Sequence, residues 1–266
     1  MKVIYLKNRV IYISLLILIF LIILSLFLYD IFSEEVSKIE ITHLEEKEET
    51  PEIILPSEEE KRKEMLLQKY QEKKLIALTF DDGPGKYTSQ LIDELTKRNV
   101  SVTFFLLGEN IEKFKDTVRF EVDTGNEIGI HSYEHRLFTK LTAQEIHEQI
   151  DKTKYLILEI TDVPITLIRV PYGSINENVR KILDYQELTN ILWTVDSKDW
   201  KFRDADKTFT YILKNLKGND IILMHDIYPT SITCALKLID YLQAESYVFV
   251  TVSEFLEIKQ LAQTLS

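Results

Sequence analysis

The chain has a single cysteine among its 266 residues, which excludes an internal disulfide. Cys234 lies in an apolar stretch, and this setting favours a small buried hydrophobic side chain over a reactive thiol. A block of basic residues is also missing beyond the first few positions, and the formal net charge is -11 at pH 7. A nucleic-acid partner is therefore not expected. The hydrophobic fraction of 45% is sufficient for a real core.

The amino-terminal segment has no charged residue from Val10 to Tyr29. A helix of about 20 residues, rising about 1.5 Å per residue, crosses a bilayer core. Basic residues precede the segment and acidic residues follow it, which predicts a cytoplasmic amino terminus with the remaining chain outside. A small-residue cleavage site is lacking, and no cysteine follows to carry a lipid. We therefore expect residues 1–32 to form an uncleaved single-pass anchor and not a cleaved signal peptide.

Residues 33–74 are rich in Glu and Lys and contain two prolines, a composition typical of a solvated stalk. Their last part, 57–74, can form a helix because Ser57 precedes Glu60 in capping-box spacing. Three side chains are expected to dock this helix on the following domain: Met65, Leu66 and Tyr70.

From Leu75 onward, apolar runs alternate with amphipathic segments. The expected strands are 75–80, 102–106, 127–130, 167–170, 191–195, 221–224 and 248–250. The expected helices are 88–97, 110–122, 142–160, 176–185, 208–216, 231–244 and 252–261. About seven β-α units predict that residues 75–266 form an α/β domain whose parallel sheet is open or closed into a barrel. Catalytic groups of such folds gather at the carboxyl ends of the strands.

Two adjacent carboxylates, Asp81 and Asp82, follow the first apolar run and precede the breaker Gly83-Pro84. Neighbouring side chains at a strand end point in opposite directions. One carboxylate can therefore hold a metal ion while the other remains free to move a proton. The pair taken alone could equally cap the next helix.

His131 and His135 follow the third expected strand and are four residues apart, so both imidazoles would lie on one face of a helical turn. Together with Asp82 they offer two nitrogens and one oxygen. This set leaves coordination positions for water and substrate, as in hydrolytic zinc sites. His147, within the expected helix 142–160, is interpreted as a surface residue.

Three further polar groups follow later strands. Arg169 can keep Asp81 ionised and oriented, although an arginine alone more often forms a surface salt bridge. Trp200, beside Asp199, has the position of a packing residue or a substrate contact. His225 emerges from a buried run and can act as a general acid if a carboxylate holds it charged.

In order and spacing these residues resemble five motifs of a known family. The motifs are Thr-Phe-Asp-Asp-Gly-Pro at 79–84, His-Ser-x-x-His at 131–135, Arg-x-Pro-Tyr-Gly at 169–173, Asp-x-x-Asp-Trp at 196–200 and Leu-Met-His at 223–225. They resemble polysaccharide deacetylases, the NodB-homology enzymes of carbohydrate esterase family 4. The resemblance covers about residues 75–261. It implies a distorted (β/α)7 barrel, similar to a TIM barrel, and metal-dependent removal of acetyl groups from N-acetylated sugars.

The resemblance also implies a role for each motif residue. Asp81 would be the base, oriented by Arg169, and His225 would be the acid, tuned by Asp199. The backbone N–H of Tyr172 would help to hold the oxyanion. The implied metal ligands are Asp82, His131 and His135, and the implied pocket for the acetyl methyl group is formed by Trp200 and Leu223.

One departure from the family pattern is Ile130, where many members have an asparagine before the first metal histidine. This departure is expected to affect local packing and not ligation.

An outer domain on a stalk of about 40 residues can reach polymers near the membrane surface. The expected substrate is peptidoglycan N-acetylglucosamine, with exopolysaccharide, chitooligosaccharide and acetylated xylan as alternatives. Zinc is the expected metal, and cobalt, nickel or manganese suit the same ligands. A hypothesis of another class is a membrane-tethered, non-catalytic glycan-binding module. That module would be indicated by missing motif residues, and none is missing.

Overall fold

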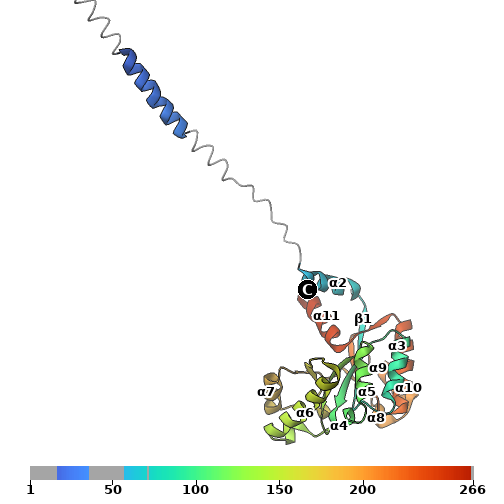
Figure 1. The fold of residues 1–266 in the computed structure, drawn as a ribbon. Helices are drawn as coiled ribbons and strands as arrows, with labels where there is room; N and C mark the ends of the chain where they lie inside the picture. The colour runs from blue at the N-terminus through green and yellow to red at the C-terminus, as the bar shows by residue number, and fades with distance from the viewer. Residues whose placement is uncertain (1–16, 36–56, 71, 265–266) are drawn as a thin grey trace, which may run out of the picture. The chain divides into compact units, whose positions relative to one another are not determined.

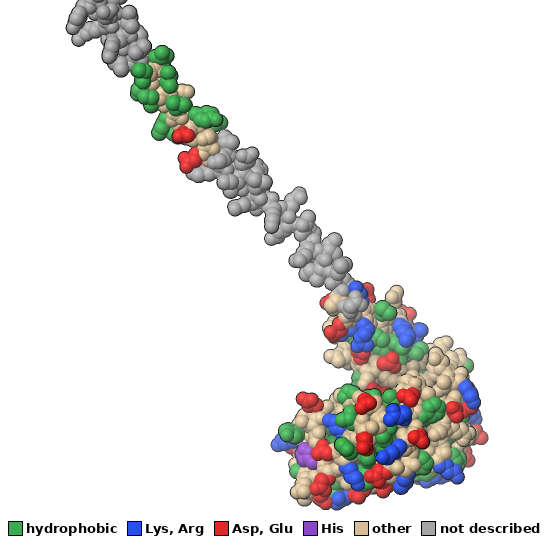
Figure 2. Space-filling view, viewed as in Figure 1, with side chains coloured by type: hydrophobic (Ala, Val, Ile, Leu, Met, Phe, Trp, Pro, Cys, Tyr) green, Lys and Arg blue, Asp and Glu red, His purple; other side chains and the backbone are tan. Residues whose placement is uncertain are grey.

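The computed structural model describes residues 17–35, 57–70 and 72–264. The chain divides into two compact units, Met1–Ser57 and Glu58–Ser266. In the first unit the structure describes the helix Ile17–Glu35, which has a mean hydropathy of 2.2 and no buried side chains over its apolar window. Hydrophobic side chains cover this helix along its length (Figure 2). By length and composition it can cross a membrane. The helix continues past Tyr29 to include Asp30, and residues 10–16 of the expected span lie outside the described residues.

The second unit contains one eight-stranded sheet in the order β5-β4-β3-β2-β1-β7-β6, with β8 paired to the start of β1. The strands are β1 (Lys74–Asp81), β2 (Thr103–Leu107), β3 (Glu127–Ser132), β4 (Leu167–Ile168), β5 (Thr189–Asn190), β6 (Val195–Asp196), β7 (Asp220–His225) and β8 (Tyr247–Phe249). Every pair is parallel. No ladder joins β5 to β6 among the described residues, so the curled sheet is a half-barrel. This confirms the predicted distorted (β/α)7 fold.

Helices surround the sheet (Figure 1). They are α2 (Glu58–Tyr70), α3 (Thr88–Lys97), α4 (Gly108–Ile111), α5 (Lys115–Asp123), α6 (Ala143–Thr161), α7 (Glu177–Tyr185), α8 (Asp199–Phe202), α9 (Ala205–Asn215), α10 (Pro229–Ala244) and α11 (Val252–Thr264). The bounds of α3 agree with the prediction. The predicted helix 110–122 is instead two helices, α4 and α5, because Phe114 between them has a non-helical backbone at φ -131° and ψ 43°.

The predicted strand 191–195 is wrong except at its last residue, Val195, which begins β6. The chain leaves the sheet after β5 and re-enters it at β6, so residues 191–194 form no ladder. At the two ends of this segment, the N–H groups of Ile191 and Thr194 still donate to β4 and β7. The carbonyls of Ile191 and Leu192 instead accept hydrogen bonds from the buried guanidinium of Arg169 at 3.0 and 3.5 Å. A buried arginine needs several acceptors, and it takes them from this crossing segment.

The helix α2 packs on the domain beside α11 (Figure 1). Tyr70 is buried and Leu66 is half-buried in the cluster that contains Phe255 of α11. Met65 is 68% exposed, so its predicted docking role is wrong. It lies on the solvent side of the helix, one residue from Leu66, because side chains adjacent in sequence point about 100° apart on a helix.

The core explains why the central strands read as continuous apolar runs. All positions of β1 after the first are buried, as expected of a parallel strand covered on both faces.

Cys234 of α10 is also fully buried, and burial raises the pKa of its thiol to about 12. This confirms the interpretation of Cys234 as an inert core residue. Acidic and basic side chains are interspersed on the face of the domain that Figure 2 shows.

Candidate active site

The carboxyl ends of the central strands meet at one cavity of about 360 Å³. Register places Asp81 of β1 opposite His225 of β7, and β3 delivers His131 from the other side of β2. The lining residues are Asp81, Asp82, His131, His135, Tyr172, Trp193, Asp196, Trp200, Leu223, His225 and Tyr228. Arg169 and Asp199 lie behind this lining and contact it. The structure therefore brings all ten predicted site residues together, and their roles stay predictions.

The predicted metal ligands converge on one carboxylate oxygen. Oδ1 of Asp82 lies 3.5 Å from Nε2 of His131 and 3.5 Å from Nε2 of His135. The ligand atoms of the three side chains all lie within 4.8 Å of one another. Asp82 Oδ1 is buried and has no hydrogen-bond partner in the described part of the chain. An unsatisfied buried carboxylate oxygen is costly, and a cation between the two imidazoles and this oxygen would satisfy it.

The predicted helical turn between the two histidines is wrong. His131 is part of β3, whereas His135 lies in the following loop with a left-handed backbone at φ 56°. The loop returns on itself because Ser132 Oγ accepts from the His135 N–H at 2.9 Å and the Gln149 side chain accepts from the Glu134 N–H at 2.9 Å. The imidazoles meet, with centroids 4.9 Å apart, through this loop and not through helical spacing.

The protonation of His131 is set by its surroundings. Its Nδ1 donates to the backbone carbonyl of Arg169 at 2.7 Å, which leaves Nε2 as the acceptor that faces Asp82. Burial lowers the pKa of His131 to about 3. The side chain is therefore a neutral imidazole with a free lone pair, which is the form that binds metal ions.

Asp81 forms an ion pair with Arg169 beneath the cavity. Nη1 of Arg169 donates to Asp81 Oδ1 at 2.7 Å and to the Thr79 hydroxyl at 2.7 Å. Arg169 has no exposed surface, and its guanidinium also lies 4.2 Å from the ring centroid of Phe105. Burial raises the pKa of Asp81, and the charge of Arg169 opposes this shift. Arg169 contacts Oδ1 of Asp81, so the second carboxylate oxygen does not take part in this ion pair.

His225 and Asp199 form the opposite side of the site. Nδ1 of His225 lies 2.8 Å from Asp199 Oδ1, and the His225 backbone N–H donates to Asp199 Oδ2 at 2.8 Å. The Ser231 hydroxyl donates to the same Oδ2 at 2.7 Å. Burial acts to lower the pKa of His225, but its hydrogen bond to Asp199 and the charge of Asp199 outweigh burial and raise the pKa to about 9. His225 is therefore an imidazolium at neutral pH and can donate a proton from Nε2.

Exposed aromatic rings flank the cavity. Tyr172 has a left-handed backbone at φ 61° and a ring that is edge-on to His135, with centroids 4.7 Å apart. Tyr172 is 66% exposed and Trp200 is 46% exposed, whereas Leu223 is buried at the base.

Sequence reasoning missed Trp193 and Tyr228 as lining residues. Each lies in a loop near a motif residue, with Tyr228 three positions after His225. Their aromatic character was the only feature of the sequence that could have indicated a place in the cavity lining. His147 is half-buried on α6 and accepts from Gln186, away from the cavity.

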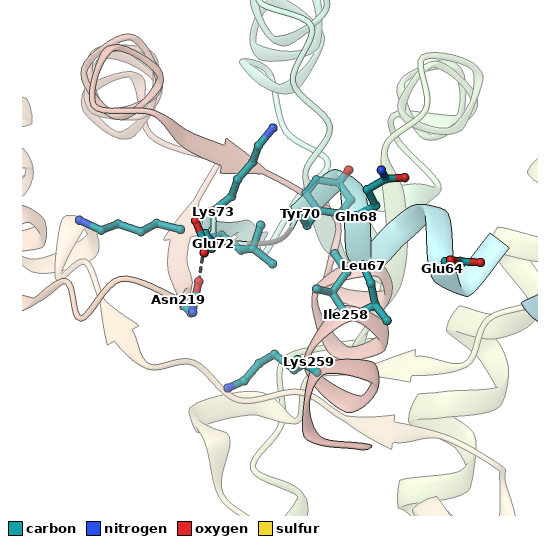
Figure 3. Close-up of a pocket in the computed structure, with 12 residues that line it drawn as sticks. Glu64, Leu67, Gln68, Tyr70, Glu72, Lys73, Asn219, Ile258 and Lys259 are labelled. Atoms are coloured by element: carbon teal, nitrogen blue, oxygen red, sulfur yellow. Dashed lines mark hydrogen bonds between the residues drawn. The ribbon is translucent and has the colours of Figure 1, made fainter. Parts of the chain in front are cut away.

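A larger hollow lies at the other end of β1, between α2 and α11 (Figure 3). Its lining includes the apolar side chains of Leu67 and Ile258 and the charged residues Glu72, Lys73 and Lys259. It contains no group of three metal-ligating side chains among the described residues. The chemistry-bearing residues are therefore in the smaller cavity, at the end of the sheet where α/β folds place their active sites.

The sequence matches the family model for polysaccharide deacetylase over residues 68–191. The chain is 38% identical over 188 residues to the peptidoglycan-N-acetylmuramic acid deacetylase PdaC of Bacillus subtilis, a match that covers 70% of this chain and 40% of PdaC. It is 37% identical over 182 residues to the peptidoglycan-N-acetylglucosamine deacetylase PgdA of Listeria monocytogenes, covering 68% of this chain and 38% of PgdA. The chain thus spans about two fifths of the length of these two relatives.

Solved structures share the fold. The structure of B. subtilis PdaC superposes with a TM-score of 0.70 at 37% identity and covers 73% of this chain and 95% of that one. A pseudoenzyme of carbohydrate esterase family 4 from Bacillus anthracis superposes with a TM-score of 0.66 at 29% identity, covering 70% and 66%. The fold alone therefore does not establish catalysis, and activity must be argued from the site residues. On the sequence and structural matches together, this chain belongs to the polysaccharide deacetylase family.

Proposed function

We propose that this protein is a membrane-anchored, metal-dependent hydrolase that removes N-acetyl groups from peptidoglycan N-acetylglucosamine outside the cell. One observation carries the proposal: the unpartnered Asp82 Oδ1 lies between two imidazole nitrogens and beside the Asp81 and His225 pair. Residues 1–32 would be the anchor, the following segment the stalk, and the folded unit the catalytic domain. Peptidoglycan is favoured because PdaC and PgdA are named for it.

The residues present fit a divalent cation held by Asp82, His131 and His135. Bound there, an ion such as Zn²⁺ would lower the pKa of a water molecule and polarise the acetyl carbonyl. Asp81 accepts the proton of the attacking water, and Arg169 fixes the direction of its carboxylate. The Tyr172 N–H donates to the developing oxyanion. His225 then donates its Nε2 proton to the leaving amine, and acetate and a free amino sugar are released.

Metal removal tests the reaction class. The full chain in detergent is incubated with peptidoglycan glycan strands, acetylated chitooligosaccharide, exopolysaccharide or acetylated xylan, and acetate is measured. We expect acetate release to stop after chelation and to return with zinc, cobalt, nickel or manganese, and to be fastest on peptidoglycan. Release that survives exhaustive chelation would exclude a metal enzyme. Binding of glycan without any acetate release would instead support a non-catalytic glycan-binding module.

The pH dependence of the activity tests the proposed role of His225 as the general acid. Activity should fall as pH rises through about 9, because His225 then loses the proton that it must donate. Asp199→Asn removes the facing charge and should move this alkaline limb down by about 1–3 pH units, as expected when a close opposite charge is lost. Ser231→Ala is the matched control, since it removes one hydrogen bond to Asp199 but not the charge. The measurement is kcat/KM as a function of pH. If activity falls at the same alkaline pH in the wild type and in Asp199→Asn, the role of His225 as the general acid is contradicted.

A further inference from the structure

We infer that Asp226 is a positioning residue for the proposed metal site, because its buried side chain packs under the turn that carries Asp82 and holds this ligand in place. The inference rests on the proposed function. Asp226 directly follows His225 but does not line the cavity.

The turn needs an external support. Asp82 has a left-handed backbone at φ 70°, a conformation that is strained for a non-glycine residue and persists only where the surroundings impose it. Two hydrogen bonds hold the backbone: Asn110 Nδ2 donates to the Asp82 carbonyl at 2.8 Å, and the Leu107 N–H donates to the Gly83 carbonyl at 2.8 Å.

Asp226 supplies the third support by direct packing. A Cβ atom added at Gly83 would lie 2.5 Å from Oδ1 and 2.5 Å from Oδ2 of Asp226, closer than real Cβ contacts. The two carboxyl oxygens of Asp226 are therefore directed at the Cα of the residue after the ligand, with the carboxyl carbon farther away at 2.8 Å from the added Cβ. Asp226 has no exposed surface, so its position cannot relax into solvent.

Thr88 ties the Asp226 carboxyl to the far side of the same turn. The Thr88 hydroxyl donates to Asp226 Oδ2 and accepts from the Gly85 N–H at 2.8 Å. Asp226 thereby joins the turn 82–85 to the first residue of α3. Loss of the side chain would leave a void under Gly83 and would free the Thr88 hydroxyl.

Glu121 of α5 provides a matched comparison. It is also a fully buried acid, it interacts with Asp226, and both of its carboxyl oxygens lack a hydrogen-bond partner within the described ranges. The three atoms nearest to a Cβ added at Gly83 all belong to Asp226, and none belongs to Glu121. Substitution of Glu121 therefore changes a buried carboxyl close to Asp226 without removing the support of the turn.

The test is zinc affinity of the full-length metal-free protein, measured by competition with a chromophoric chelator, with circular dichroism to establish folding. Asp226→Ala should weaken zinc binding by about 10–100-fold, the range for residues that orient metal ligands. Asp226→Asn keeps the shape and the acceptor for Thr88, so its affinity should stay within a few-fold of wild type. Glu121→Gln should likewise stay close to wild type.

A double-mutant cycle covers the case in which Asp226→Ala destabilises the fold. Gly83→Ala should weaken zinc binding in the wild-type background, because the new methyl group collides with the Asp226 carboxyl. In the Asp226→Ala background the void accepts this methyl group, so the same substitution should cost less. Non-additivity of this sign supports direct packing.

Three results would overturn the inference: unchanged zinc affinity in folded Asp226→Ala, equal losses in Asp226→Asn and Asp226→Ala, or an additive cycle. Failure of the wild-type protein to bind any of zinc, cobalt, nickel and manganese would instead overturn the proposed function itself, and with it this inference.

Discussion

Asp81→Asn is expected to reduce acetate release by about 10²–10⁴-fold while zinc remains bound, because a positioned general base contributes about this much. Asparagine keeps the shape of the side chain and can still accept from Arg169, but it cannot take a proton from water. Asp81 is not one of the three convergent ligands, so metal affinity should be retained. The measurements are kcat/KM for acetate release and zinc content per chain.

Asp196→Asn is the matched control for the base, since Asp196 lines the same cavity but is paired with Lys198 at 2.6 Å. It should lose far less activity than Asp81→Asn. Full activity of Asp81→Asn would refute its role as the base. Loss of zinc from that variant would make Asp81 a ligand instead.

Arg169→Met is expected to destabilise the fold by about 3–5 kcal/mol, because removal of one partner leaves a buried charge uncompensated. The substitution removes the ion pair to Asp81 and also the donors to the carbonyls of Ile191 and Leu192. The free energy of unfolding is measured with urea. Arg136→Met is the control: it breaks an exposed ion pair with Glu145 and should cost about 0–1 kcal/mol.

The double variant Arg169→Met, Asp81→Asn distinguishes the charge from the packing. Because it no longer buries an unpaired carboxylate, it should recover part of the stability that Arg169→Met loses. No recovery would show that the backbone contacts of Arg169, and not its charge pair, carry the stability.

Several features were determined by the sequence itself, because they depend on local patterns. The alternation of apolar runs and amphipathic segments predicted the parallel α/β sheet and the bounds of α3, since each element shows its own period in the chain. Polar residues directly after apolar runs predicted the edge of the sheet at which the lined cavity lies. The motif residues from Asp81 to His225 were therefore found without coordinates.

Other features were decided only by the tertiary structure. The strand expected at 191–195 is interrupted between β5 and β6, and the carbonyls of Ile191 and Leu192 in this gap accept from Arg169, 22 and 23 residues away in sequence. The histidines meet through a loop that Gln149 of α6 supports, and not through a helical turn. The support of the Asp82 turn by Asp226 depends on contact between the ends of β1 and β7. The periodicity of a segment depends on residues that are close in sequence, and it therefore predicts local secondary structure. Buried charges and tight backbone contacts involve residues that are far apart in sequence, and they depend on the tertiary structure.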